Sequence, residues 1–301
     1  MNARMVAAAA ALALLAPAAA GAQTPSGTIT FSVVDAHPAV AGVYSVAATG
    51  GTPTRIVEGW ATAPAVSPDG RRIAVSISHR RSTTSALYVV PATGGRATYL
   101  APYSGIPAWS PNGRQVAYGY GLGLAIAPAG GGKVRHRFRS RGNPPDAFYN
   151  DPLWVGSRLL FTRTDNPPMA PGAPPATTRV MSAPARRGKA RAIPITAPAG
   201  LGLDQGELAL SPDGSTLLVA LYPTNPTFDS KPALGLVPVG GGTVRPIPGE
   251  WLHGDFSPDG TLLCVSPNPA ADGSQPISVI DLQGNVVSHL GVSGDDCDWT
   301  R

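Results

Sequence analysis

A strand-turn-strand pattern that recurs along the chain constrains the fold more than any other feature. The stretch at 64–75 reads as a short strand, a Ser-Pro-Asp-Gly turn and a second strand. Proline presets φ for such a turn and glycine accepts the positive φ, so the backbone reverses without strain. The pattern returns at 107–118, 208–219 and 254–265, and 152–161 is a degenerate copy. Repeats at a fixed period indicate an array of similar units.

Each hairpin is followed by a third strand, a glycine turn and a fourth strand. The units begin at residues 67, 110, 155, 211, 257 and 300, which are 43 to 56 residues apart. Four short strands in 40–45 residues are typical of a propeller blade. The longest interval contains a proline-rich insertion at 165–178, which we expect to be a surface loop.

The two ends of the chain complement each other. Residues 28–58 contain only the second, third and fourth strands of a unit, and 296–301 matches the missing first strand. An open six-repeat solenoid would not need such complementary fragments. We therefore predict an all-β, six-bladed propeller with four antiparallel strands per blade, closed by the C-terminal strand.

The first 22 residues have the features of a signal peptide. Arg4 precedes an Ala/Leu-rich apolar run, and Ala20-Gly-Ala22 fits a cleavage site. An uncleaved membrane anchor is the alternative. We expect a propeller at 23–301 that is exported to the periplasm or secreted. Without Arg4 the chain has 22 Lys/Arg against 18 Asp/Glu, and this small excess together with export argues against a nucleic-acid partner.

The repeat resembles that of the TolB-type (PD40, WD40-like) β-propeller family. The shared features are the Ser-Pro-Asp-Gly hairpin, the following strand and the Gly-Gly turn, with Trp109, Trp154 and Trp299 at the signature tryptophan. The resemblance covers 28–301 and implies the propeller fold. Full TolB proteins also carry an N-terminal domain that engages other Tol components, whereas this sequence passes from the leader directly into a blade.

Aligned repeats place charged side chains at one end of the channel. The position before the signature proline holds, blade by blade, Ala63, Ile106, Asp151, Glu207, His253 and Asp296. Asp255 and Asp298 follow two residues deeper. Carboxylates and an imidazole converging on a channel mouth can bind a divalent cation or a cationic group of a ligand. The alternative is that aspartates at loop-to-strand junctions cap turns and stay solvated.

Basic residues alternate along one predicted outermost strand: Lys133, Arg135, Arg137, Arg139 and Arg141. Strict alternation predicts a single positively charged face, which could contact an anionic envelope surface. Alternatively, the charges only prevent edge-to-edge pairing of exposed strands.

Cys264 and Cys297 are the only thiols. Export would favour a disulfide between them. Pairing about the turn, however, sets Cys264 opposite Gly254, the counterpart of Cys297, so both sulfurs should point the same way around the ring. This argues against a disulfide, although a shift of one residue in register would reverse the conclusion.

No nucleophile elbow, zincin motif or metal-binding Cys/His spacing is present. We therefore expect a monomeric, non-catalytic binding or scaffold propeller of the cell envelope. It would contact an envelope protein or peptide through the channel mouth, without a cofactor. The alternative is a lyase or hydrolase acting on a glycan or small molecule, with a divalent cation held by Asp151, Glu207, His253 and Asp296.

Overall fold

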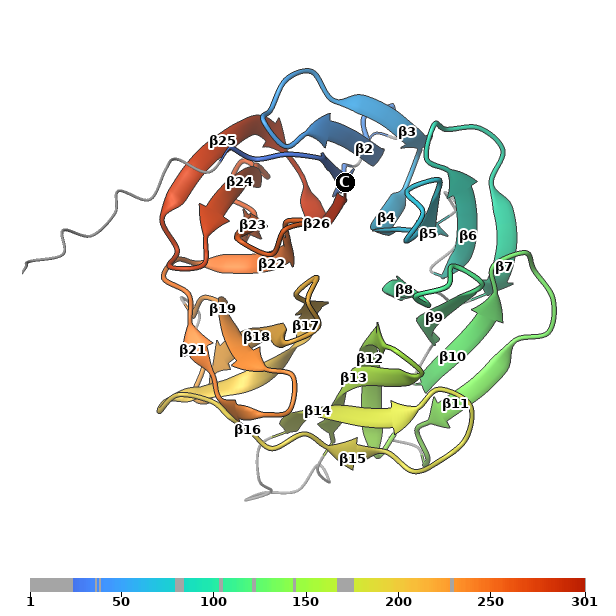
Figure 1. Ribbon diagram of the computed structural model, residues 1–301, viewed down its shortest axis with the longest axis vertical. Coiled ribbons are helices and arrows are strands. Elements are labelled where there is room, and N and C mark those ends of the chain that lie inside the picture. The colour runs from blue at the N-terminus through green and yellow to red at the C-terminus, as the bar shows by residue number, and fades with distance from the viewer. Residues whose placement is uncertain are drawn as a thin grey trace, which may run out of the picture.

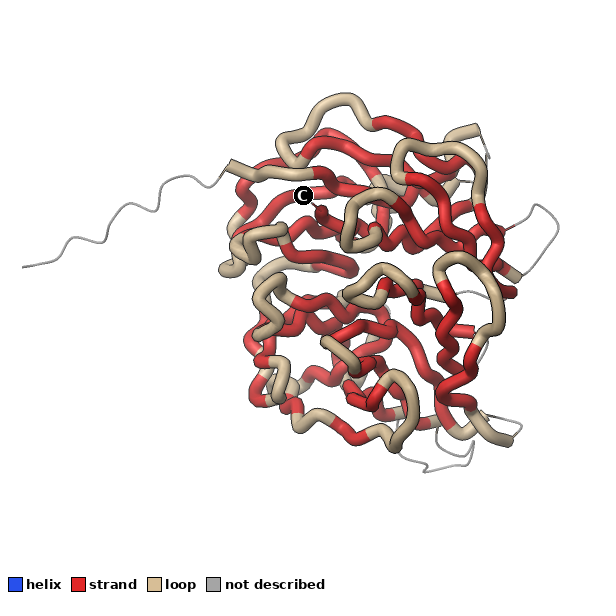
Figure 2. Tube along the Cα trace, turned by 45° about the vertical axis from the view of Figure 1, so that its right-hand side comes forward, coloured by secondary structure: helices blue, strands red, loops and turns tan. Residues whose placement is uncertain are grey.

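The computed structural model describes residues 24–35, 37, 39–78, 84–102, 105–120, 123–142, 145–166, 176–227 and 230–300. The predicted signal peptide and most of the insertion at 165–178 lie outside these ranges. No helix long and apolar enough to cross a bilayer occurs in the described part of the chain. Strands and loops make up the fold (Figure 2).

Six four-stranded antiparallel sheets surround a central axis, as the sequence predicts (Figure 1). Blade 1 combines β26 (Asp295–Thr300) with β1 (Thr28–Val33), β2 (Gly42–Ala47) and β3 (Thr54–Glu58). Blade 2 contains β4 (Ala61–Val66), β5 (Arg72–Ser78), β6 (Ser85–Pro91) and β7 (Thr98–Pro102). Blade 3 contains β8 (Pro107–Trp109), β9 (Gln115–Tyr120), β10 (Gly123–Pro128) and β11 (Arg135–Arg139).

The remaining blades follow the same order. Blade 4 contains β12 (Ala147–Val155), β13 (Arg158–Asp165), β14 (Thr177–Pro184) and β15 (Arg191–Ala192). Blade 5 contains β17 (Leu201–Leu210), β18 (Thr216–Pro223), β19 (Ala233–Pro238) and β21 (Arg245–Pro246). Blade 6 contains β22 (Trp251–Phe256), β23 (Leu262–Pro267), β24 (Pro276–Asp281) and β25 (Val286–Ser293). A parallel pair between β16 (Ile195–Thr196) and β20 (Gly242–Thr243) joins the rims of blades 4 and 5, which the sequence did not predict.

The repeated hairpin is held by its serine. In blade 6 the Ser257 hydroxyl donates to Asp259 Oδ1 at 2.6 Å and accepts from the Leu262 amide at 2.9 Å. Gly260 has a φ of 74°, which a β-carbon would strain. The same two bonds recur at the serines of blades 2, 3 and 5. These serines are buried, so the hydroxyl satisfies an amide that water does not reach.

Apolar side chains pack between neighbouring blades. The described residues form six hydrophobic clusters, and each draws on two adjacent blades. Two signature tryptophans tie the inner strands together: Trp109 Nε1 donates to Ala65 O at 2.8 Å and Trp154 Nε1 donates to Ala108 O at 3.1 Å. Burial of these interfaces is the main driving force for the ring.

The ring closes through β26, which pairs with β1 and sets Trp299 opposite Ile29. Contrary to the expectation from sequence, Cys264 and Cys297 form a disulfide, with Cα atoms 6.4 Å apart. The reason is a one-residue difference in register: Cys264 lies opposite Asp255, not Gly254. Cys264 therefore faces blade 1, where Cys297 faces it in return.

The expectation of one charged face along the basic strand is also wrong. Pairing of β11 with β10 skips Arg137, because a bulge lies at this residue. Before the bulge Val134 packs into the interface with blade 2, and after it Phe138 packs into the interface with blade 4. A bulge reverses the alternation of side chains. Lys133, Arg135, Arg137, Arg139 and Arg141 therefore do not share a face.

Candidate functional site

The blades enclose a central cavity of about 770 Å³. The charged residues predicted at the mouth all line it: Asp151, Glu207, His253 and Asp296 at the first level, and Asp255 and Asp298 below them. Ala63 and Ile106 complete the six aligned positions on the side of blades 2 and 3. At these aligned positions, the acidic groups are therefore confined to an arc formed by blades 4, 5, 6 and 1.

Irregular backbone turns these side chains into the channel. In five blades the pairing of the first and second strands is interrupted next to the mouth position. Three aligned residues adopt left-handed backbone without being glycine: Ala63, Asp151 and Asp296, with φ of 50°, 47° and 50°. Such a conformation costs about 1–2 kcal/mol per residue. Strained backbone of this kind is typical of functional sites, and here it recurs at the equivalent position of three blades.

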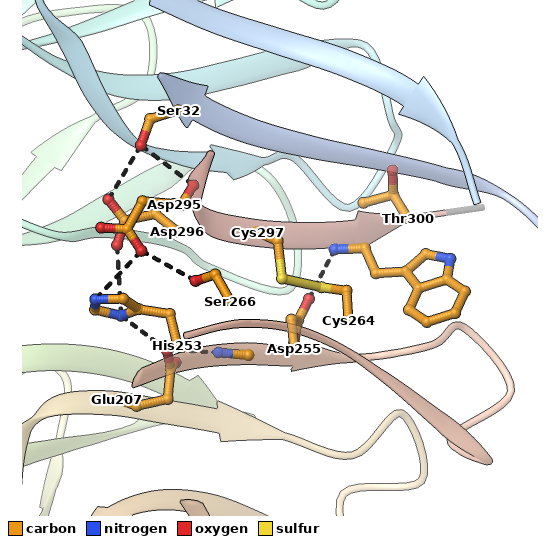
Figure 3. Close-up of a disulfide and its surroundings, with 12 residues drawn as sticks. Ser32, Glu207, His253, Asp255, Cys264, Ser266, Asp295, Asp296, Cys297 and Thr300 are labelled. Carbon is orange, nitrogen blue, oxygen red and sulfur yellow. Dashed lines mark hydrogen bonds and ion pairs between the residues drawn. A yellow bond between two sulfur atoms is a disulfide. The ribbon is translucent and has the colours of Figure 1, made fainter. Parts of the chain in front are cut away.

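His253 is the centre of the mouth, with three carboxyl groups around its ring (Figure 3). Its Nδ1 lies 3.3 Å from Glu207 Oε2 and 3.5 Å from Asp296 Oδ1. Its Nε2 lies 3.6 Å from Asp295 Oδ1, which also accepts from the Ser266 hydroxyl at 3.0 Å. Burial lowers the pKa of His253, but Glu207, Asp296 and Asp295 outweigh it and raise the pKa to about 10. The imidazole is therefore cationic at neutral pH.

The mouth carboxylates also join one blade to the next. Asp151 Oδ2 accepts from the Gly206 amide at 3.1 Å, and Glu207 Oε2 accepts from the Gly254 amide at 3.1 Å. Asp296 Oδ2 accepts from the Ala63 amide at 3.2 Å, while its Oδ1 faces His253. These bonds fix the orientation of the carboxyl groups. They also give part of the acidic ring a structural role between blades, unlike the solvated turn caps that were the alternative from sequence.

Burial controls the ionisation of Asp151 and Asp296. It raises the pKa of Asp151 to about 6, against the opposing hydrogen bond from Thr162, and Glu207 raises it further. It raises the pKa of Asp296 to about 6, although the charge of His253 lowers it. Both carboxyl groups lose their protons just below neutral pH. A positively charged group entering the mouth would favour their ionised form.

The two deeper aspartates, Asp255 and Asp298, likewise accept hydrogen bonds from backbone amides of the next blade. Asp255 Oδ2 accepts from the Trp299 amide and Asp298 Oδ2 accepts from the Val66 amide, each at 2.9 Å. Burial raises the pKa of Asp298 to about 7. The pKa of Asp255 is raised by burial and then by the neighbouring Asp298. The pair adds a second acidic level inside the cavity.

Alignment of the repeats found every mouth acid except the role of Asp295. Asp295 directly precedes the aligned position, and the structure brings it to the imidazole beside Asp296. Two adjacent residues can face one group only where the strand is irregular, and the bulge in β26 between the partners of Thr30 and Ser32 provides this. His253, Asp295 and Asp296 together offer ligand atoms within 4.8 Å of one another, close enough for one metal ion.

Fold and cavity together define the class as a six-bladed β-propeller closed by its own C-terminal strand. No family model and no curated protein sequence matches the chain. TolB from Acinetobacter baumannii is similar in structure, with a TM-score of 0.67 at 15 % identity over 91 % of this chain and 66 % of that one. This chain thus spans about two thirds of that protein.

Other propellers are similar too. A putative TolB from Agrobacterium tumefaciens gives a TM-score of 0.55 at 15 % identity, covering 90 % of both chains. An oligogalacturonate lyase in complex with manganese gives 0.51 at 12 % identity, over 84 % of this chain and 71 % of that one. The sequence-based resemblance to the TolB propeller is confirmed at the level of the fold. At these identities the fold alone is shown.

Proposed function

We propose that the protein is an exported, non-catalytic binding propeller of the cell envelope. Its partner, a protein or peptide, docks over the channel mouth and inserts a cationic group among the mouth carboxylates. The observation that carries this proposal is the convergence of Glu207, Asp295 and Asp296 on one imidazole at the opening of a 770 Å³ cavity. Three carboxyl groups exceed the single charge of His253, which leaves the mouth acidic.

The arrangement suits binding because it is rigid before a ligand arrives. Hydrogen bonds to the next blade hold the carboxyl groups of Asp151, Glu207 and Asp296 in place. A preorganised acceptor set loses little side-chain entropy on binding. The buried disulfide supports the exported location, since disulfides persist in oxidising compartments.

Binding of a short lysine peptide, compared with the same peptide acetylated on lysine, tests this proposal. Fluorescence anisotropy should show saturable binding of the charged peptide and at least about tenfold weaker binding of the neutral one. Glu207→Gln and Asp296→Asn should each weaken binding of the charged peptide. Equal affinity for both peptides, or unchanged affinity in both variants, would contradict the proposal.

Asp213→Asn is the matched control for these variants. Asp213 lies in the Ser-Pro-Asp-Gly hairpin of blade 5, does not line the central cavity, and accepts from Ser211 and the Ser215 amide. The corresponding residue of blade 3 is already an asparagine, Asn112, which accepts the same two bonds. The control therefore removes one negative charge and leaves the hairpin intact. A pull-down from envelope extract with the same variants would identify the partner.

The alternative function is a cation-dependent lyase or hydrolase acting on a glycan or small molecule. The close approach of His253, Asp295 and Asp296 favours it, as this set could hold a divalent ion. Metal analysis of the purified protein separates the two functions. A stoichiometric ion that is lost in a Glu207→Ala/His253→Ala variant would favour the enzyme.

A further inference from the structure

A second cavity, of about 510 Å³, lies on the outer rim, away from the channel. It is formed where the end of β7 in blade 2 meets the outer part of blade 3. We call it the rim pocket, and its lining residues are Pro102, Tyr118, Tyr120, Val134, His136, Arg137, Phe138 and Arg139. None of these residues lines the central cavity. The volume lies in the range of small-molecule sites.

The wall of the rim pocket is aromatic. The rings of Tyr120 and His136 lie 4.4 Å apart, centre to centre, at an angle of 56°. Tyr118 is only 1 % exposed, and burial raises its pKa to about 12, so its phenol stays neutral. Flat, apolar side chains held by the surrounding blade favour a ligand that carries a flat ring.

The charge of the rim pocket is uncompensated. Arg137 and Arg139 line it, and among the described residues neither forms an ion pair with a carboxylate. In the next blade, by contrast, Arg163 and Arg179 both pair with Asp165. The Arg137 guanidinium lies over the Phe138 ring and donates through Nη2 to Pro184 O at 2.9 Å. Its buried Nε has no acceptor in the part of the chain that is described.

The bulge in β11 explains why aromatic and basic residues line the same pocket. With regular alternation, Arg137 and Arg139 would lie on one face of the strand and His136 on the other. Because the bulge interrupts the alternation, the consecutive residues from His136 to Arg139 all border one cavity. The aromatic residues and Arg139 thereby line the same cavity.

We propose that the rim pocket binds a small aromatic carboxylate, with its ring against Tyr120 and His136 and its carboxylate paired with Arg139. A guanidinium group binds a carboxylate through two parallel hydrogen bonds, which orients the ring. The site is independent of the channel mouth, which is acidic and suits cations. A negative binding result at one site therefore does not count against the proposal for the other site.

Ligand-observed NMR and calorimetry with indole-3-acetate as probe test the assignment. Binding should be saturable at millimolar concentration or below, and the neutral indole-3-acetamide and the ring-free acetate should each bind at least about tenfold more weakly. No saturable binding, or equal binding of the acid and its amide, would overturn the proposal.

Amino-acid substitutions test whether the probe binds at the rim pocket. Arg139→Met keeps the length of an exposed side chain and should weaken binding at least about tenfold. Tyr120→Leu should weaken it as well, because the ring surface is lost. Arg141→Met, also exposed but outside the lining, should bind as the unmodified protein does, as should Glu207→Gln at the channel mouth. Full affinity in both Arg139→Met and Tyr120→Leu would show that the probe binds elsewhere and would overturn the assignment.

Discussion

At the scale of single residues, the deepest acids of the channel show how burial and charge compete. Asp298 accepts a bond from the Val66 amide, but burial raises its pKa to about 7. The folded state therefore holds this proton more tightly than the unfolded state does. The stability that the protonated Asp298 contributes is fully present below about pH 4 and is lost as the pH rises through 7.

Replacing this carboxyl group should make stability less dependent on pH. Asp298→Asn keeps an oxygen for the Val66 amide and removes the buried charge. We expect a gain of about 1–3 kcal/mol at pH 8 and little change at pH 4, as measured by thermal unfolding. The Asp213→Asn variant should show no gain at pH 8, since hydrogen bonds from Ser211 and Ser215 lower the pKa of that group to about 2. An equal gain for Asp298→Asn at both pH values would mean that its charge is unimportant.

The positions of the mouth residues could be predicted from sequence, but their contacts could not. Each repeat brings its equivalent residue to the same place, so aligning the hairpins was enough to gather Asp151, Glu207, His253 and Asp296. The approach of Asp295 to His253 depends on a bulge, which leaves no periodic signal. The rim pocket has no periodic signal in the sequence either, because the bulge at Arg137 interrupts the alternation from which side-chain faces are predicted.

At the scale of the element, the repeated hairpin depends on a buried hydroxyl more than on its turn residues. Ser257 is 3 % exposed and serves as donor to Asp259 and acceptor for the Leu262 amide. Blade 4 has Val155 at this position and a shorter turn through Gly156, and it still forms its hairpin. The strands can therefore pair without the serine, whose contribution is to satisfy the amide.

Ser257→Ala should destabilise the fold without unfolding blade 6. The buried Leu262 amide loses its acceptor, which costs about 1–3 kcal/mol in the free energy of unfolding. Urea titration measures this cost. Ser274→Ala is the comparison, because Ser274 makes a similar bond to Asp272 in an exposed loop and should change stability by less than about 0.5 kcal/mol. A Ser257→Ala effect as small as that of Ser274→Ala would show that water replaces the hydroxyl.

At the scale of the whole molecule, ring closure depends on β26, which alone among the described strands reaches its blade from the other end of the chain. The complementary chain ends predicted this closure, because both fragments are visible in the sequence. The disulfide was not predictable with the same security, since its geometry depends on a register that the turn alone leaves uncertain by one residue. Closure thus combines the β26–β1 ladder, the bond from the Trp299 amide to Asp255, and a covalent link from β26 to blade 6.

Removing the covalent link tests how closure is shared among these contacts. Cys264→Ala/Cys297→Ala opens a loop with a sequence separation of 33, for which chain entropy predicts a loss of about 3–4 kcal/mol. The hydrogen-bonded ladder remains, so we expect a folded ring whose amides in β26 and β1 exchange faster than those of blades 3 and 4. Hydrogen exchange measures this pattern, with the reduced unmodified protein as a second sample. Uniformly faster exchange in all six blades would mean that the disulfide stabilises the ring as one cooperative unit instead of holding its final strand.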